Sequence, residues 1–239
     1  MVTNLEDELE PYWEEFDGLV QERIRSAVRA AHFKYFDACR LKLKALWYIN
    51  SRVEDLDLKY GQLVDSFLTQ ETSDRFVKND DGSWSYFPFF EALEFENLLN
   101  QGKACLDCFS KAVGCTFGEL PNNISKLENV LKSREGKNDR RGKQAYKLLQ
   151  KIAQARNSLD GIILDPGKNK KSIRDLVSHR EHASIYFRIT QSQQRSPNAL
   201  VRHDHPEIAR LRNYRVTEIS ETVWYHTKKL VEESLPLLL

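Results

Sequence analysis

The chain has 239 residues and is nearly neutral, with a formal charge of +1, 41% hydrophobic residues and 30% charged residues. This composition excludes a disordered chain, and no apolar run approaches the roughly 20 residues that a membrane-spanning helix needs. The start of the chain, MVTNLEDELEPYWEE, is acidic where a secretory signal would be basic and then apolar, so we expect a cytoplasmic protein.

Apolar residues at steps of three and four predict helices along the N-terminal part of the chain. The first helix runs from about Leu9 to Val28, and the pattern continues through Ala30 to Ile49 without Gly or Pro. Ser51-x-x-Glu54 then has the form of a capping box, which indicates either a second helix or a break in a long one. A helix is expected to reach Leu68.

A β-hairpin follows at Asp81-Gly82, because an Asp-Gly pair favours the positive φ angles of a tight turn. Its strands are Phe76 to Lys78 and Trp84 to Phe87. Helical spacing resumes from Phe90 to Gly114, where the small residue Gly102 suits close helix packing.

The next segment is predicted to form two helices joined by a basic loop. Asn122 or Asn123 can cap a short helix over Ile124 to Leu131, and a loop from Ser133 to Arg141 leads to a helix from about Gly142 to Leu159. After a turn at Asp165-Pro166-Gly167, Ser172 can cap a helix that carries Arg174 to about His179.

The C-terminal part combines a second hairpin with a last helix. Ile185 to Thr190 and Ala199 to Val201 are predicted strands, although the same apolar residues could extend the preceding helix. Pro206 begins an amphipathic helix that passes Leu230. The fold class is therefore mostly α, a helical bundle with one or two small β-hairpin excursions, in a single domain over 1–239 with hairpin insertions near 76–87 and 185–203.

Charge is distributed unevenly along the chain. Residues 1–17 hold seven acids and no Lys or Arg, whereas residues 132–180 hold fourteen Lys or Arg against five Asp or Glu. Such a local excess of positive charge attracts phosphate. The alternative is a solvated basic face that the acidic N-terminal helix balances.

Common metal and catalytic motifs are absent from the sequence. Cys105-Leu-Asp-Cys108 lies inside a predicted helix without a second cysteine pair, so we interpret it as core packing and the four cysteines as reduced thiols. His203-Asp204-His205 lacks a further ligand and is more typical of a polar helix start. Neither a glycine-rich phosphate loop nor HExxH or GxSxG occurs, and we expect no metal and no cofactor.

The remaining motif is Arg174-Asp-Leu-Val-Ser-His179. An arginine, a polar residue next to it and a histidine after four intervening residues resemble the R-x(4–6)-H signature of the HEPN superfamily, the higher eukaryote and prokaryote nucleotide-binding domains. The motif lies late in the chain at the start of a helix, among basic residues, as that resemblance requires. Asp175 matches only approximately, since the residue after the arginine is often Asn in that family.

The resemblance implies metal-independent RNA cleavage at a site formed by two copies of the motif across a dimer interface. His179 is the candidate proton acceptor from a ribose 2′-hydroxyl, because an imidazole titrates near neutral pH. Arg174 can hold a phosphate in a bidentate fork, and Asp175 can orient His179 or hold Arg174. We expect RNA to be bound also by Lys168, Lys170, Lys171 and His182.

A dimer is a requirement of this hypothesis. Five residues along an ideal helix separate Arg174 from His179 by roughly 7.5 Å in rise and about 140° in direction, so one chain need not aim both at one phosphate. A two-fold axis can bring Arg174 of one chain to His179 of the other. We therefore expect a homodimer that acts on RNA, and a toxin or defence role would add a cognate inhibitor protein. The alternative is a non-catalytic helical module for protein interaction or nucleotide binding.

Overall fold

The computed structural model describes residues 30–68, 76–165, 172–175, 185–190, 194–201 and 214–238. Within these ranges the chain is mostly helical with one small antiparallel sheet, which confirms the predicted fold class. The predicted helix over Leu9 to Val28 and the Pro166-Gly167 turn lie outside the described residues. The prediction that the last helix runs without a break from Pro206 is wrong, because Arg215 is extended and forms a β-bridge with Leu200, so that α7 begins only at Val216. The elements in chain order are α2 (Ala30–Leu68), β1 (Val77–Lys78), β2 (Trp84–Tyr86), α3 (Phe89–Thr116), α4 (Ile124–Glu135), α5 (Arg140–Leu159), β3 (Ile185–Ile189), β4 (Leu200–Val201), α7 (Val216–Ser234) and the 3-10 turn η2 (Leu235–Leu237).

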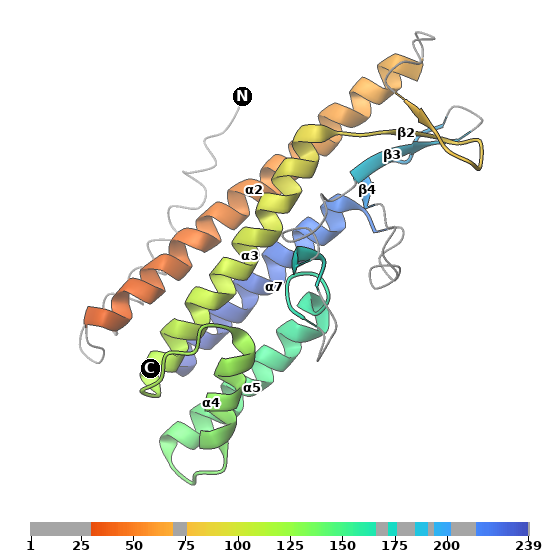
Figure 1. Ribbon diagram of the computed structural model, residues 1–239. Helices are drawn as coiled ribbons and strands as arrows, with labels where there is room; N and C mark the ends of the chain where they lie inside the picture. Colours follow the sequence, from red (N-terminus) through yellow and green to blue (C-terminus); the bar gives the residue numbers. More distant parts are fainter. Residues whose placement is uncertain are drawn as a thin grey trace.

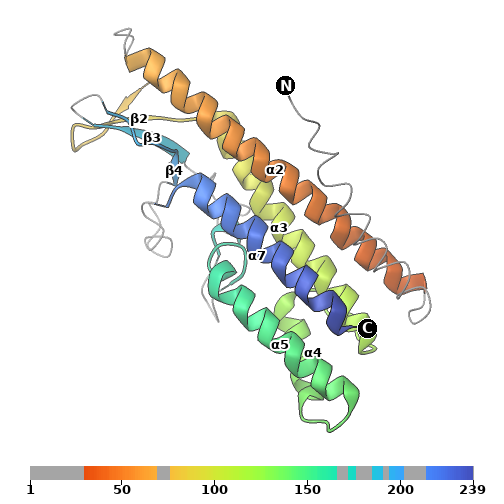
Figure 2. The ribbon, with the colours of Figure 1, turned by 180° about the vertical axis from the view of Figure 1, so that it is seen from behind.

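The two long helices α2 and α3 run side by side in opposite directions and set the length of the bundle (Figure 1). Helix α7 packs against both of them, α5 packs against α7, and α4 packs against α5, as the view from behind also shows (Figure 2). The core between these helices is made of large side chains that are almost completely buried, among them Leu43, Leu46, Phe95, Leu98, Phe109, Leu127, Leu131 and Leu148.

Helix α2 is continuous, so the capping-box interpretation of Ser51-x-x-Glu54 is wrong. The Ser51 hydroxyl donates to the carbonyl of Trp47, one turn earlier in the same helix, at 3.3 Å. Glu54 accepts from the Asn50 amide at 2.9 Å instead of returning to a cap. The buried stripe of α2 passes through this region at Val53, and its packing keeps the helix intact.

Both predicted hairpins are confirmed, and they join into one sheet in the order β1-β2-β3-β4. Gly82 has a φ of 77° in the first turn, as the Asp-Gly pair predicts. Strands β2 and β3 pair directly, with Tyr86 opposite Phe187, although about a hundred residues separate them in the chain. The Arg188 guanidinium donates to the carboxylate of Asp81 in the first turn at 2.6 Å, which ties the two hairpins together.

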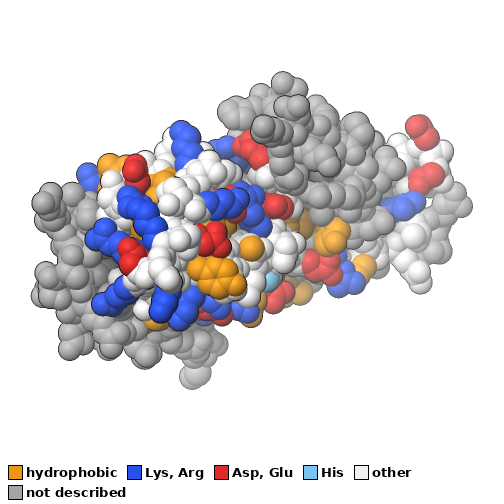
Figure 3. Space-filling view, turned by 90° about the horizontal axis from the view of Figure 1, so that it is seen from below, with side chains coloured by type: hydrophobic (Ala, Val, Ile, Leu, Met, Phe, Trp, Pro, Cys, Tyr) orange, Lys and Arg blue, Asp and Glu red, His pale blue; other side chains and the backbone are white. Residues whose placement is uncertain are grey.

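The hairpin of α4 and α5 is fixed by two caps and one close contact. Asn123 accepts from the backbone of Lys126 at 2.9 Å, as predicted, and Asp139 caps α5 by accepting from Gly142 N–H at 2.7 Å. The helices extend further than predicted, which shortens the basic loop to residues 136–139. A Cβ at Gly142 would lie 1.9 Å from the carbonyl oxygen of Lys137, so only glycine permits this loop. Lys and Arg side chains gather at this end of the molecule (Figure 3).

Candidate functional site

The backbone of Arg174 is anchored to the turn that follows α5. The N–H groups of Ile173 and Arg174 donate to the carbonyls of Gly161 and Ile162, each at 3.0 Å. Ser172 N–H donates to the Asp165 carboxylate at 3.0 Å, and the Ser172 hydroxyl accepts from Asp175 N–H at 3.4 Å, which confirms Ser172 as the predicted cap. The segment 172–175 is thus held at a defined place beside α3.

The side chain of Arg174 is held by two hydrogen bonds. Its Nε donates to Asn100 Oδ1 on α3 at 3.1 Å, and its Nη1 donates to Asp175 Oδ1 at 2.7 Å. The side chain keeps 26% of its surface exposed, and Nη2 has no hydrogen-bond partner among the described residues. Of the two roles expected of Asp175, the structure therefore shows that it holds Arg174. The arrangement leaves one edge of an oriented guanidinium available to an anion.

Three further α3 residues surround this guanidinium. Asn100, Lys103 and Asp107 follow at helical steps of three and four, so they share one face of α3. Lys103 Nζ lies 3.8 Å from the Asp107 carboxylate. None of the three residues was predicted as part of the site. Their polar spacing is visible in the sequence, but no local signal pairs Asn100 with a residue 74 positions later.

The two acids beside Arg174 respond differently to it. Burial raises the pKa of Asp107 above its ordinary value, although the charges of Lys103, Arg174 and Lys111 act against that rise. Burial would also raise the pKa of Asp175, but the hydrogen bond and the charge of Arg174 outweigh it and lower that pKa. Asp175 therefore remains the ionised partner that orients Arg174.

The other predicted site residues, His179, His182, Lys168, Lys170 and Lys171, lie outside the described residues. The pairing of Arg174 with His179 therefore stays a prediction.

The CxxC interpretation as core packing is confirmed. Cys105 is completely buried, and its Sγ lies 3.7 Å from Sγ of Cys39 on α2, while Cys108 is partly buried and packs against the core. Among the described residues no three His, Cys, Asp or Glu side chains are placed to hold a metal ion.

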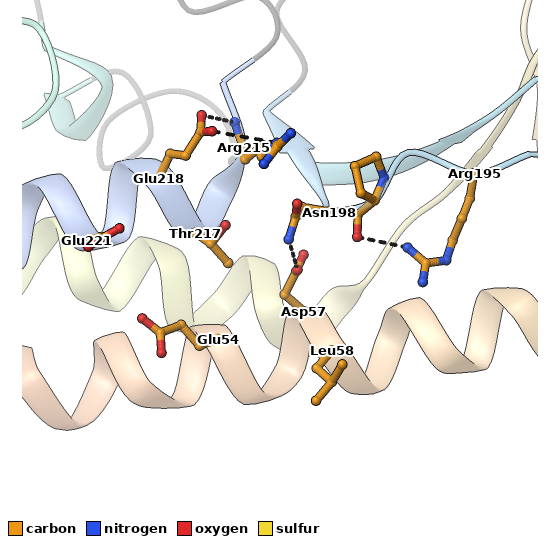
Figure 4. A pocket seen from close by; sticks show the side chains of 10 residues that line it. Glu54, Asp57, Leu58, Arg195, Asn198, Arg215, Thr217, Glu218 and Glu221 are labelled. Atoms are coloured by element: carbon orange, nitrogen blue, oxygen red, sulfur yellow. Dashed lines mark hydrogen bonds and ion pairs between the residues drawn. The ribbon is translucent and has the colours of Figure 1, made fainter.

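A second concavity, of about 450 Å³, lies between α2, the loop before β4 and the start of α7 (Figure 4). Two of its six charged residues, Asp57 and Arg195, hold the loop in place. Asp57 accepts from Asn198 Nδ2 at 2.6 Å and from Ala199 N–H at 2.7 Å. Arg195 forms a two-pronged ion pair with Asp65 on α2, at 2.7 and 2.9 Å. We interpret this pocket as a structural joint between the sheet and α2.

Glu91 lies behind this pocket in the first turn of α3 and is completely buried. Neither of its carboxyl oxygens has a hydrogen-bond partner among the described residues. Burial and then the charge of Asp57 raise the pKa of Glu91 to about 9, so it is a neutral acid at pH 7.

No protein-family model matches the chain, and neither a curated protein nor a solved structure matches it. No helix in the described ranges is both long and apolar enough to cross a bilayer. The function has to be inferred from the residues themselves.

Proposed function

We propose that this protein is a HEPN-like, metal-independent endoribonuclease whose active site is shared by two copies of the chain. The observation that carries the proposal is the Arg174 guanidinium. It is oriented by Asn100 and Asp175, partly exposed, and unpartnered at Nη2 in the described part of the chain. Nη2 of this fixed and permanently charged guanidinium can donate to a phosphodiester oxygen.

The proposed reaction is a transesterification within the RNA strand. One His179 imidazole accepts the proton of a ribose 2′-hydroxyl as its oxygen attacks the adjacent phosphorus. The bond from phosphorus to the 5′-oxygen breaks, and a protonated His179 of the second copy gives its proton to that oxygen. Arg174 stabilises the additional negative charge on the five-coordinate phosphorus. The products are a 2′,3′-cyclic phosphate and a 5′-hydroxyl.

An exposed apolar group at the start of α3 supports the second copy as a partner. Phe87, Phe89, Phe90 and Leu93 each expose 49% to 61% of their surface. Leu93 precedes Asn100 by seven residues, which is about two helical turns, so both residues lie on the same side of α3. A copy that covers Leu93 around a two-fold axis would therefore lie beside Arg174.

The test is cleavage of an end-labelled single-stranded RNA in EDTA by the full chain. Wild type should cleave, and Arg174→Ala and His179→Ala should each lower the rate by about 10²-fold or more, the usual contribution of a positioned acid, base or charge. Arg174→Lys should remain impaired, because it keeps the charge but loses the planar group that Asn100 and Asp175 orient. Lys59→Gln, at the far end of α2, is the matched surface control and should cleave normally.

Light scattering tests the shared site separately. We expect a dimer for wild type and a monomer without cleavage for Leu93→Asp. A fully active monomeric wild type would contradict the composite site, and the absence of cleavage by wild type would contradict the nuclease and favour the non-catalytic module.

A further inference from the structure

Helix α5 carries positive charge and no acid. Between Arg140 and Leu159 there are six Lys or Arg and no Asp or Glu, and the whole α4–α5 hairpin, residues 124–159, has ten Lys or Arg against three acids. On the face seen from below, Lys and Arg side chains surround only a few acids in the described part of the surface (Figure 3). The charge is therefore concentrated on one end of the bundle.

The outward side of α5 is defined by helical spacing. Lys143, Tyr146, Lys147 and Gln150 follow at steps of three and four, and all four are exposed, Tyr146 by 50%. The opposite stripe is buried in the core and fixes the orientation of the helix; it consists of Ala145, Leu148, Ile152, Ala155 and Leu159. We call Lys143, Tyr146, Lys147 and Gln150 the outer α5 face.

Among the described residues, the cations of the outer α5 face have no acidic partner, whereas those nearer the C-terminal end of the helix do. Arg156 binds Glu128 and Asp160, each at 2.8 Å, and Lys151 binds Glu233 at 2.9 Å. Neither Lys143 nor Lys147 is ion-paired within the described ranges. A cation in the first turn also opposes the helix dipole, so Lys143 lowers the stability of the helix that carries it.

A pocket of about 450 Å³ borders this face. Lys143 and Lys147 line it from α5, and Pro236 and Leu237 of η2 line its other side. Arg140 and Asp139 also line the α5 side, where the Asp139 carboxylate caps the helix at Gly142 N–H. Cations therefore outnumber acids on one side of the pocket, and the other side is apolar. A nucleotide has the matching chemistry, since it joins an anionic phosphate to a flat apolar base.

We propose that the outer α5 face binds the sugar-phosphate backbone of single-stranded RNA, with Lys143 and Lys147 on phosphates and Tyr146 stacked on a base. This inference rests on the proposed function for its ligand and adds a second contact surface to it. From Lys147 to the end of α5 at Leu159 the helix rises about 18 Å, so the face is separate from the Arg174 site.

Two other polyanions fit the outer α5 face less well. An anionic membrane surface would need large apolar side chains beside the cations, but the apolar stripe of α5 is buried in the core. Protein–protein interfaces are depleted in Lys relative to the rest of the surface, whereas this face has two. The mixture of Lys, Tyr and Gln is typical of nucleic-acid contacts.

The experiment measures binding of a fluorescent single-stranded RNA to the full chain by anisotropy, in EDTA, over a range of salt concentrations. The RNA carries 2′-O-methyl groups, so that no 2′-hydroxyl can attack a phosphate and the strand stays intact. Each phosphate contact contributes about 0.7 to the slope of log K against log salt. Lys143→Gln with Lys147→Gln should therefore flatten the slope by about 1.4 and weaken binding about 25-fold at 0.1 M salt.

The control is Lys59→Gln with Lys78→Gln, which changes the net charge equally at the other end of the bundle and should leave binding unchanged. Tyr146→Ala should weaken binding at least about fivefold with the slope unchanged, and Tyr146→Phe should restore it. Tyr225→Ala, an equally exposed tyrosine on α7, controls for the loss of an aromatic ring.

Equal slopes for wild type and the Lys143/Lys147 variant would overturn the inference. So would a result in which the two substitutions weaken binding to phosphatidylserine vesicles but leave RNA binding unchanged. The proposed nuclease is judged by a different readout, the loss of cleavage in Arg174→Ala. RNA binding through α5 without cleavage would refute the nuclease alone, and cleavage with unchanged slopes would refute the α5 surface alone.

Discussion

Glu91 makes the stability of this protein depend on pH in a direction opposite to that of most carboxylates. Its pKa rises from 4.5 to about 9 because the side chain is buried and Asp57 lies beside it. A carboxyl with a raised pKa binds its proton more tightly in the folded chain than in the unfolded one. The contribution of this proton to the free energy of unfolding is fully present below pH 4.5 and is lost as the pH rises toward 9.

The magnitude follows from the two pKa values. At pH 7 Glu91 is ionised in the unfolded chain but protonated in the folded chain. Each pH unit above 4.5 lowers the free energy of unfolding by about 1.36 kcal/mol, so the loss at pH 7 is about 3 kcal/mol. Glu91→Gln has nearly the same shape and no charge to lose. It should raise the free energy of unfolding by about 3 kcal/mol at pH 7 and remove a slope of about 1.4 kcal/mol per pH unit.

Urea unfolding of wild type and Glu91→Gln, followed by circular dichroism at several pH values between about 5 and 8, measures this difference. Glu94→Gln is the matched control, since Glu94 lies on the same helix but keeps 25% of its side chain exposed beside Arg52. The difference between wild type and Glu91→Gln should grow with pH. Parallel stability curves would refute the buried neutral acid.

Two glycines lie where helices or loops pack closely, and replacing either one should lower the free energy of unfolding. Gly102→Ala should lower the free energy of unfolding by about 1–3 kcal/mol, because the new Cβ would lie 2.8 Å from Val223 Cγ1 where α3 meets α7. Gly142→Ala should destabilise by a similar amount despite the better helix propensity of alanine, because its Cβ would lie 1.9 Å from the Lys137 carbonyl oxygen. Thermal unfolding checks both, and Gly136→Ala, which meets nothing within 4 Å, should change the melting temperature little. An unchanged melting temperature in either test variant would show that the backbone relaxes there.

Helix caps could be predicted from the sequence where the capping hydrogen bond joins residues that are close together in the chain. Asn123 and Ser172 cap as expected because each bonds a backbone N–H three residues later. The predicted helix start at Ser51-x-x-Glu54 is wrong for a physical reason. The helix has buried residues on both sides of Ser51, at Ile49 and Val53, and breaking it there would expose this stripe.

Contacts between distant segments could not be predicted from the chain. Periodicity indicates which face of α3 is polar, but it does not indicate that Asn100 on that face binds Arg174. Likewise each hairpin was predicted by itself, whereas the pairing of β2 with β3 depends on the bundle bringing two distant turns together. The Arg174 half of the motif could thus be proposed from its residues, while its support from α3 required the structure.

Charge has different roles at the two ends of the bundle. Near the sheet, charged side chains stabilise the fold: Asp57 accepts a hydrogen bond from Asn198 in the loop, and Arg195 forms an ion pair with Asp65. At the α4–α5 end, Lys143 and Lys147 stay exposed and unpaired within the described chain, and Lys143 lies near the start of the helix, where an acid would be more stabilising. Among the described residues no acid is ion-paired with these two cations, so their charge is available to an anionic ligand. The same reasoning applies to Nη2 of Arg174, so one polyanion, such as the RNA proposed above, would meet a cation at each of the two places.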